Sequence, residues 1–477
     1  KKERKRIMGM IYEKIKRHSQ KEDYPFHMPG HKRRGLDIFD GVHPYEVDFT
    51  EIDGLDDLHA PEEMFRASMD RARSYYGTRE TFYLVNGSTS GIMAAIASVC
   101  QLGDTIIMSR NCHKSVYMAV ELLGLKPVYL YPKVEEENGL VTHIFCGDLQ
   151  TIVDNHPDAK AVMLVSPTYE GMTMDVKAVA DITKTAGMTF IVDEAHGAHF
   201  PFLKKREERY LQFPTSAIEY GADLVIQSLH KTMPALTQTA LLHVCTEKVS
   251  IRRVQECIDY FETTSPSYLL TASIDDAISF GIEKKEKFED YAQRLYWLRE
   301  ELKKLEHLSL VPVDDPGKLV ISTSKTNMTG KQLYDILLNN YHLQMEMAQE
   351  TYCLAMTSVC DTQEGYDRLI QALREIDRNL VTKRPVVFSK WMMENELVYV
   401  PNRARAMEMT ENLIEESEGK VSGEYVYLYP PGIPLIVPGE RVDQACIDKI
   451  REYEKKGLKV RGMADPDGKT IKIINEQ

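Results

Sequence analysis

Ala222-Asp223-Leu224-Val225-Ile226-Gln227-Ser228-Leu229-His230-Lys231 is the stretch from which the organisation of the chain is best inferred. Its apolar run predicts a buried strand, followed by a hydroxyl, an imidazole and a lysine. Burial lowers the pKa of a lysine and leaves part of it as the free amine, which attacks carbonyl carbons. Lys231 is therefore a candidate for forming a Schiff base, although a lysine after a strand is also commonly a solvated loop residue.

Length and composition restrict the kind of protein. At 477 residues the chain exceeds one ordinary hydrophobic core, so two or three domains are expected. Its 43% hydrophobic and 27% charged residues are typical of a soluble globular protein, and a net charge of −13 disfavours a nucleic-acid partner. No apolar run reaches the roughly 18 residues that span a bilayer. The eight cysteines include no C-x-x-C pair, which favours reduced thiols and a cytoplasmic location.

Short apolar runs alternate with helical periodicity from residue 80 to about 245, which predicts strand–helix units and a mostly parallel sheet. Strands are expected at 81–85, 105–108, 127–130, 161–165 and 189–192, and each ends in polar residues. Ligands of parallel sheets bind beyond the carboxyl ends of the strands, so these ends are considered together. They comprise 109–114, 166–171, 193–199 and 228–231.

The segment between the first of these strands and its helix is a candidate anion site. We expect residues 86–91 to form a turn and residues 92–100 to form a buried helix. The small residues Gly87, Ser88 and Thr89 would leave backbone N–H groups free at the helix N-terminus, where the dipole favours a phosphate. An ordinary capped helix is the alternative, because the motif matches neither a P-loop nor G-x-G-x-x-G.

The remaining chain is expected to surround this large domain. Residues 1–60 should form a helix and an irregular arm, and residues 61–305 the large domain. A smaller α/β domain is expected at 306–385, with strands at 319–322 and 353–357 and helices at 331–340 and 364–379. A C-terminal domain is expected at 386–477, after a linker at 383–385.

Together the polar strand ends provide what pyridoxal 5′-phosphate (PLP) requires of a protein. The cofactor needs a lysine for its aldehyde, an acid at its pyridine nitrogen, an anion site and a group that packs against its ring. Lys231 would form the Schiff base, and Asp193 would pair with the protonated pyridine nitrogen. The phosphate would be contacted by Gly87, Ser88, Thr89 and Ser228. The ring would pack between His113 and Ala195.

Other interpretations of these residues exist. Asp193 could cap a helix, and His113 could be a loop histidine with a local hydrogen bond. Asp193-Glu194-Ala195-His196 could belong to a zinc site that uses His196 and His199.

The motifs also resemble those of a known family. They are Asn86-Gly87-Ser88-Thr89, Arg110-Asn111-Cys112-His113-Lys114-Ser115, Asp193-Glu194-Ala195-His196-Gly197, Ser228-Leu229-His230-Lys231 and Pro430-Pro431-Gly432-Ile433-Pro434. The set resembles the ornithine/lysine/arginine decarboxylases, from His27-Met28-Pro29-Gly30-His31 to Pro438-Gly439-Glu440. The resemblance implies an α/β protein of the PLP-dependent transferase-like class (aminotransferase fold type I), with smaller α/β C-terminal domains. Because the first motif begins at residue 27, where larger members carry a receiver-like wing domain, the chain resembles the short form.

The resemblance further implies an enzyme that removes the α-carboxyl group of a basic amino acid. It implies a homodimer, or a higher oligomer, with shared active sites, in which Thr264 reaches the neighbouring subunit's cofactor phosphate. His196 and His230 would contact the cofactor, and His230 or Lys231 would return a proton to Cα. The expected reaction is arginine to agmatine in polyamine biosynthesis; lysine to cadaverine and ornithine to putrescine are also considered. Less favoured are an aminotransferase and a non-catalytic PLP-binding protein.

The cationic end of such a substrate requires acidic partners. Asp53, Asp56 and Glu440 are the carboxylates nominated for this role, donated by the same subunit or by its partner.

Overall fold

The computed structural model describes residues 10–34, 36, 41–203, 211–384, 394–428, 433–455, 460–465 and 467–476. Its centre is a seven-stranded sheet in the order β2-β8-β7-β6-β5-β3-β4. The strands are β2 (Glu80–Leu84), β3 (Thr105–Ser109), β4 (Lys126–Leu130), β5 (Ala161–Val165), β6 (Thr189–Asp193), β7 (Leu224–Gln227) and β8 (Ala240–Val244). The five strands from β7 to β4 are parallel, and β8 runs antiparallel to both of its neighbours. The prediction of a mostly parallel sheet is confirmed.

Both faces of this sheet are covered, which explains why its strands are almost continuously apolar. Successive side chains point to opposite faces. Ile106 and Met108 belong to the core beneath α3 (Gly87–Val99) and α4 (Lys114–Leu122). Ile107 belongs to a second core with α5 (Cys146–Asn155) and α6 (Val176–Thr185). Helices therefore lie on both faces of the sheet.

Two local expectations are corrected. Helix α3 begins at Gly87, whereas the sequence suggested a turn up to residue 91. Gly87 has a φ of +78°, which glycine adopts without strain, so the chain enters the helix directly from β2. Lys231 does not directly follow the strand, because β7 is followed by the short helix α7 (Leu229–Thr232), which contains it.

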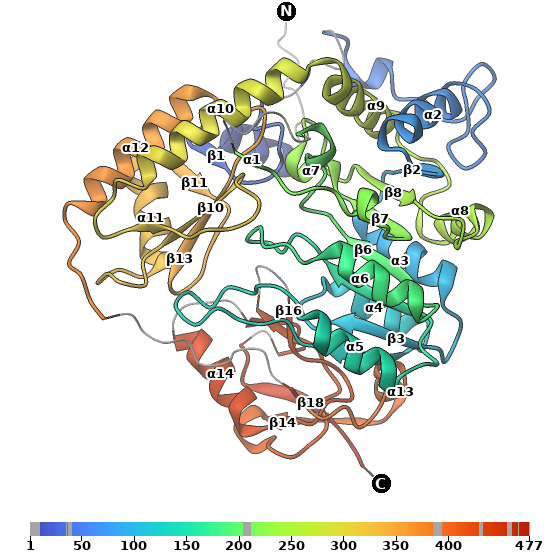
Figure 1. Cartoon of the computed structure of the whole chain (residues 1–477). Helices are drawn as coiled ribbons and strands as arrows, with labels where there is room; N and C mark the ends of the chain where they lie inside the picture. Colours follow the sequence, from blue (N-terminus) through green and yellow to red (C-terminus); the bar gives the residue numbers. More distant parts are fainter. Residues whose placement is uncertain are drawn as a thin grey trace, which may run out of the picture.

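A second, four-stranded sheet lies beside the first, in the order β12-β13-β10-β9. Its strands are β9 (Ser309–Leu310), β10 (Lys318–Ser322), β12 (Met347–Ala348) and β13 (Tyr352–Met356). Helices α10 (Lys285–Leu302), α11 (Gly330–Tyr341) and α12 (Gln363–Asp377) lie around this sheet (Figure 1). The strands and helices predicted between 319 and 379 are found within a few residues of their expected bounds.

The amino-terminal arm joins the two sheets. Helix α1 (Met10–Ser19) leads to β1 (Tyr24–Phe26), which pairs in parallel with β11 (Leu343–Met345). Three further helices flank the large sheet: α2 (Met64–Tyr76), α8 (Ile251–Phe261) and α9 (Tyr268–Glu283). No helix among the described residues is long and apolar enough to cross a membrane.

The C-terminal segment has its own core, formed by residues such as Leu435, Ile447 and Ile471. It contains α13 (Pro401–Ala406), the paired strands β14 (Met409–Leu413) and β18 (Thr470–Ile474), and α14 (Gln444–Lys455). A small sheet has the order β16-β15-β17, from β15 (Val426–Leu428), β16 (Ile433–Ile436) and β17 (Val460–Arg461). Pro430, Pro431 and Gly432 lie outside the described residues.

Candidate active site

A pocket of about 390 Å³ lies at the carboxyl end of the parallel strands. Its walls come from the start of α3 and from the segments that follow β3, β5, β6 and β7, as predicted for the polar strand ends. The lining includes Gly87, Ser88, Thr89, His113, Asp193, Ala195, His196, His230 and Lys231. Met28 of the arm and Ile433 of β16 complete it, so distant parts of the chain meet here.

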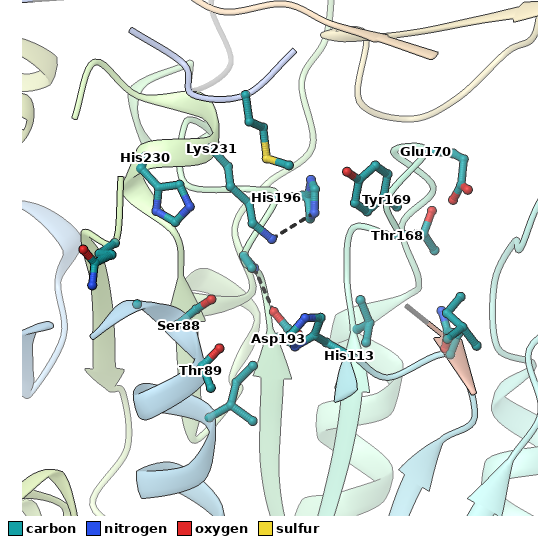
Figure 2. A pocket seen from close by; sticks show the side chains of 18 of the residues that line it. Ser88, Thr89, His113, Thr168, Tyr169, Glu170, Asp193, His196, His230 and Lys231 are labelled. Atoms are coloured by element: carbon teal, nitrogen blue, oxygen red, sulfur yellow. Dashed lines mark hydrogen bonds between the residues drawn. The ribbon is translucent and has the colours of Figure 1, made fainter. Parts of the chain in front are cut away.

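Lys231 points into this pocket from α7, with its Nζ 3.1 Å from His196 Nε2 (Figure 2). Burial lowers the pKa of the Lys231 amine, while the nearby Asp193 carboxylate acts in the opposite direction. A lowered pKa is what burial predicts for a lysine, and it favours the reactive free amine.

Asp193 is the last residue of β6 and is buried. Its Oδ1 accepts a hydrogen bond from the backbone N–H of Ala195 at 3.0 Å. Burial raises the pKa of the Asp193 carboxyl group, and the Lys231 ammonium would lower it. A buried carboxylate facing the pocket is the group that a protonated pyridine nitrogen requires.

His113 caps α4 and lies on the pocket wall. Its Nδ1 is 2.8 Å from Ser115 Oγ, which fixes the orientation of the ring. Burial, together with the charge of Lys231, lowers the pKa of His113 to about 3, so the ring is neutral at pH 7. A neutral imidazole is suited to packing against a flat ring. The contact with Ser115 at the start of α4 does not prevent the ring from doing so.

The N-terminus of α3 has features that suit an anion. Asn86 provides no side-chain cap, and the first N–H groups of a helix have no intrahelical partner. Glu262 accepts hydrogen bonds from the N–H groups of Val85 and Asn86 just before the helix, at 2.6 and 2.7 Å. The Ser88 and Ser228 hydroxyl groups lie 2.7 Å apart at the same place, which suits a phosphate.

His230 has a defined tautomer. Its Nδ1 is 3.0 Å from the Thr239 carbonyl oxygen, so Nδ1 carries the proton and donates it. Burial lowers the pKa of His230 to about 4. At pH 7 its Nε2 is therefore a hydrogen-bond acceptor.

Three side chains in or beside the pocket were given no role in the sequence analysis, although Glu170 belongs to the predicted strand end 166–171. Lys318 opens β10, is buried, and places its Nζ 3.3 Å from His196 Nδ1. Glu346 accepts hydrogen bonds from the Met28 N–H at 2.8 Å and from the Tyr169 hydroxyl. Glu170 lines the pocket and accepts a hydrogen bond from the Tyr352 hydroxyl at 2.8 Å. Lys318 comes from the second sheet and Glu346 from the bend between β11 and β12. No local pattern connects them with residues more than 100 positions earlier.

Two of the three carboxylates nominated for the substrate are corrected by their contacts. The four hydrogen bonds that Asp56 accepts come from the N–H groups of Asp57, Glu62, Glu63 and Phe65, so it caps α2. Glu440 is wholly buried, pairs with Arg110 at 2.9 Å and lies outside the pocket lining. Asp53 and Thr264 are exposed and lie outside the pocket lining, so their proposed contacts across a dimer stay predictions.

The residues of the pocket fit PLP. They combine a buried amine, a buried carboxylate, a neutral ring and an uncapped helix N-terminus, which are the four groups that the cofactor needs. The zinc hypothesis has no comparable support. His196 contacts two lysines and His199 contacts Asp315, and the described residues contain no cluster of three or more potential ligands.

Comparisons with known proteins agree with this geometry. The family model described as Orn/Lys/Arg decarboxylase, major domain, matches residues 10–360, and that of the C-terminal domain matches residues 387–464. The chain belongs to the Orn/Lys/Arg decarboxylase family. Membership confirms the expected enzyme class, a PLP-dependent amino-acid decarboxylase. The chain is also 31% identical to the arginine decarboxylase of Bacillus subtilis, over 98% of both chains.

Solved structures of related fold confirm the predicted fold class of this decarboxylase. Lysine decarboxylase A from Pseudomonas aeruginosa superposes with a TM-score of 0.74 at 19% identity, covering 97% of this chain and 80% of that one. An alanine–glyoxylate aminotransferase from Nostoc gives 0.56 at 15% identity, covering 75% of this chain and 96% of that one. The large domain is thus of the aminotransferase type.

Proposed function

We propose that this chain decarboxylates L-arginine to agmatine and CO2, a step of polyamine biosynthesis, with PLP bound at Lys231. The observation that carries the proposal is the pocket in which Lys231, Asp193 and the N-terminus of α3 converge. Arginine is preferred as substrate because the relative that is 31% identical along nearly the whole chain is an arginine decarboxylase.

Each side chain has a distinct task in this mechanism. PLP, when bound, supplies a ring that withdraws the electron pair left at Cα as CO2 departs. Lys231 would hold its aldehyde carbon, Asp193 would keep a positive charge on its pyridine nitrogen, and the α3 N-terminus would hold its phosphate. His113 and Ala195 would restrict the ring to one plane from opposite faces. A dielectric constant below that of bulk water would strengthen these electrostatic contacts.

Proton return to Cα is assigned to Lys231. His230 is neutral at pH 7 and its single ring proton is donated to the Thr239 carbonyl, so its Nε2 has no proton to give. The Lys231 amine lies in the pocket and has a pKa lowered by burial, which makes it competent both to accept and to return a proton.

The direct test uses purified enzyme with arginine, lysine and ornithine, measuring CO2 and the product amine. We expect the largest kcat/KM with arginine. Lys231→Ala should reduce kcat by at least about 10³-fold, and borohydride treatment of the wild type should leave a phosphopyridoxyl group on Lys231. A label on another lysine, release of CO2 from none of the three amino acids, or accumulation of a keto acid would contradict the proposal.

The acid that receives the guanidinium is assigned to Glu170. Asp193 and Glu170 are the carboxylates that line the pocket among the described residues, and Asp193 is needed by the cofactor. Glu170 is buried, and burial raises the pKa of its carboxyl group, so an incoming cation would stabilise its charged form.

We expect Glu170→Gln to raise the KM for arginine by at least about tenfold, as the loss of one charge-assisted hydrogen bond predicts. Asp53→Asn is the comparison, since Asp53 is exposed outside the pocket. If only Asp53→Asn raises the KM, the distal acid comes from the exposed arm instead.

We propose a homodimer that uses this arm. Tyr45, Phe49 and Ile52 expose 85%, 46% and 53% of their surfaces, which is unusual for large apolar side chains near one another in sequence. Ser265, next to Thr264, donates a hydrogen bond to Glu51 at 3.1 Å, so the arm adjoins the loop assigned to the neighbouring phosphate. Light scattering should give twice the chain mass, and a Phe49→Asp/Ile52→Asp variant should give monomers; a wild-type monomer would contradict the proposal.

A further inference from the structure

We propose that Lys318, which lies outside the pocket lining, acts through the His196 imidazole as a positioning residue that keeps the Lys231 amine unprotonated. The inference deepens the proposed function and rests on the role given there to Lys231.

His196 lies between two lysines, Lys231 of the pocket lining and the buried Lys318. Its Nε2 is 3.1 Å from Lys231 Nζ, and its Nδ1 is 3.3 Å from Lys318 Nζ. The contact with Lys231 is visible in Figure 2. Tyr169 packs against the imidazole with ring centroids 4.6 Å apart, which holds the ring in this plane. Both nitrogens of the ring are thus committed to a lysine.

The imidazole allows only one of the two lysines to be an ammonium that donates to it. Neutral histidine has one N–H donor and one acceptor nitrogen. Burial is the largest cause that holds the pKa of His196 well below its usual value, and the charge of Lys318 acts in the same direction, so the ring is neutral at pH 7. If Lys318 donates to Nδ1, then Nε2 carries the proton and donates it to Lys231. That hydrogen bond requires a lone pair, and hence a neutral amine, on Lys231.

Asp315 fixes the charge on Lys318. Its Oδ2 lies 4.0 Å from Lys318 Nζ and is buried without a hydrogen-bond partner, while Oδ1 accepts from His199 Nε2 at 3.2 Å and from the Gly317 N–H at 2.9 Å. The Lys318 stem lies across Gly171, where a Cβ would be 2.7 Å from its Cγ. Burial lowers the pKa of Lys318 to about 8, so it remains charged at pH 7.

The other groups around the two lysines are accounted for. Asp193 and Glu346 face Lys231 and favour its ammonium form, so they oppose the arrangement. His113 and His230 adjoin His196 and are neutral at pH 7, because their pKa values lie at about 3 and about 4. Among the charges that act on Lys318, Asp315 is the largest and raises its pKa; an ammonium on Lys231 would lower it, Glu346 raises it and Lys32 lowers it.

The test measures the apparent pKa of Lys231 in the apoenzyme by competitive acetylation across pH, read by mass spectrometry of the Lys231 peptide. Asp315→Asn keeps the size of the side chain and the Oδ1 contacts but removes the charge that holds the Lys318 ammonium. Lys318 can then become neutral, and Lys231 can donate to His196. We expect the pKa of Lys231 to rise by about one pH unit.

This variant tests whether Asp315 holds the charge on Lys318. Removing the negative charge of Asp315 alone would lower the pKa of Lys231, whereas the loss of the Lys318 ammonium that the proposal predicts would raise it, so the sign of the change distinguishes the two outcomes. Lys318→Met/Asp315→Asn removes one charge of each sign, leaves no buried charge unpaired, and should also raise the pKa. Lys318→Arg should stay close to wild type. An unchanged or lowered Lys231 pKa in both charge-removing variants would overturn the proposal.

Two controls complete the design. Lys449→Met removes a buried lysine of α14, paired with Glu452 at 2.9 Å and remote from the pocket, and should leave the Lys231 pKa unchanged. PLP capture by each apoenzyme, followed by borohydride and peptide mapping, shows separately whether Lys231 is the attachment site. A label elsewhere refutes the proposed function, whereas a label at Lys231 with unaltered pKa refutes only the inference about Lys318.

Discussion

Glu194 is a residue of the site segment whose role is structural. It follows Asp193 and accepts hydrogen bonds from Ser216 Oγ at 2.7 Å, the Ala217 N–H at 2.6 Å and Gln227 Nε2 at 2.7 Å. These contacts connect the end of β6 to β7. Glu194 thereby helps to position the adjacent Asp193 carboxylate. Burial raises the pKa of Glu194 to about 7, although the hydrogen bonds oppose the rise.

The pKa of Glu194 predicts a pH-dependent stability. In the unfolded chain the group titrates near 4.5, so folding favours its protonated form. Its contribution is fully present below pH 4.5 and is lost as the pH rises to about 7, which amounts to about 3 kcal/mol. Urea unfolding at pH 5 and pH 8 should show a smaller fall in Glu194→Gln than in the wild type. The exposed Glu286→Gln should behave as wild type, and equal falls in all three proteins would refute this assignment.

At the scale of one element, α3 combines a packing face with the N-terminus proposed to hold the phosphate. Its apolar residues Ile92, Ala95 and Ile96 are buried in the main core, which fixes the axis of the helix against the sheet. Glu262 holds the chain just before its first turn. The N–H groups that a phosphate would use are therefore rigidly placed at the pocket.

Ser88→Ala tests the N-terminus of α3. A hydrogen bond to a charged group contributes about 1.5–3 kcal/mol, so the Kd for PLP should rise by at least about tenfold, measured by titrating the apoenzyme. Ser98→Ala is the matched control on the same helix, because the Ser98 hydroxyl donates to the Ala95 carbonyl at 2.7 Å, near the C-terminal end. Equal Kd values for the two variants would remove Ser88 from the phosphate site.

At the scale of the whole molecule, one buried ion pair joins the C-terminal segment to the large sheet. Arg110 follows β3, and its guanidinium donates to Glu440 at 2.9 Å and to the Leu435 carbonyl at 3.3 Å. Asn395 and the Val437 N–H also donate to Glu440 at 3.0 Å. Ile433, from the same segment, lines the pocket, so this contact also positions a wall of the site.

Glu440→Gln should destabilise the protein by about 3–5 kcal/mol, because it leaves the Arg110 guanidinium buried and unpaired. Urea unfolding gives the change, and Arg110→Met/Glu440→Gln should recover part of it. The KM for arginine should stay within about twofold of wild type, as expected for a residue outside the pocket. A stable Glu440→Gln with a raised KM would restore Glu440 as a substrate contact.

Much of the fold was predictable because its signals are local. The uninterrupted apolar runs of β5, β6 and β7 can only be strands covered on both faces, and parallel strands must bring their carboxyl ends to one edge. The pocket residues from Gly87 to Lys231 follow from that rule. The start of α3 was placed too late, since Gly87, Ser88 and Thr89 are weak helix formers whose position is decided by packing.

The sequence by itself determined which side chains follow the strands and that Lys231, Asp193 and His113 share one edge of the sheet, because strand periodicity and chain order are enough to establish both. Only the tertiary structure decided how the nominated acids are used. The sequence alone does not distinguish Asp56 and Glu440 from Glu170, since all three are carboxylates. Packing between distant elements decides which groups each of them contacts. The same holds for Lys318, which reaches His196 because the second sheet packs beside the first. This contact depends on packing between segments far apart in the sequence, which no local sequence pattern predicts.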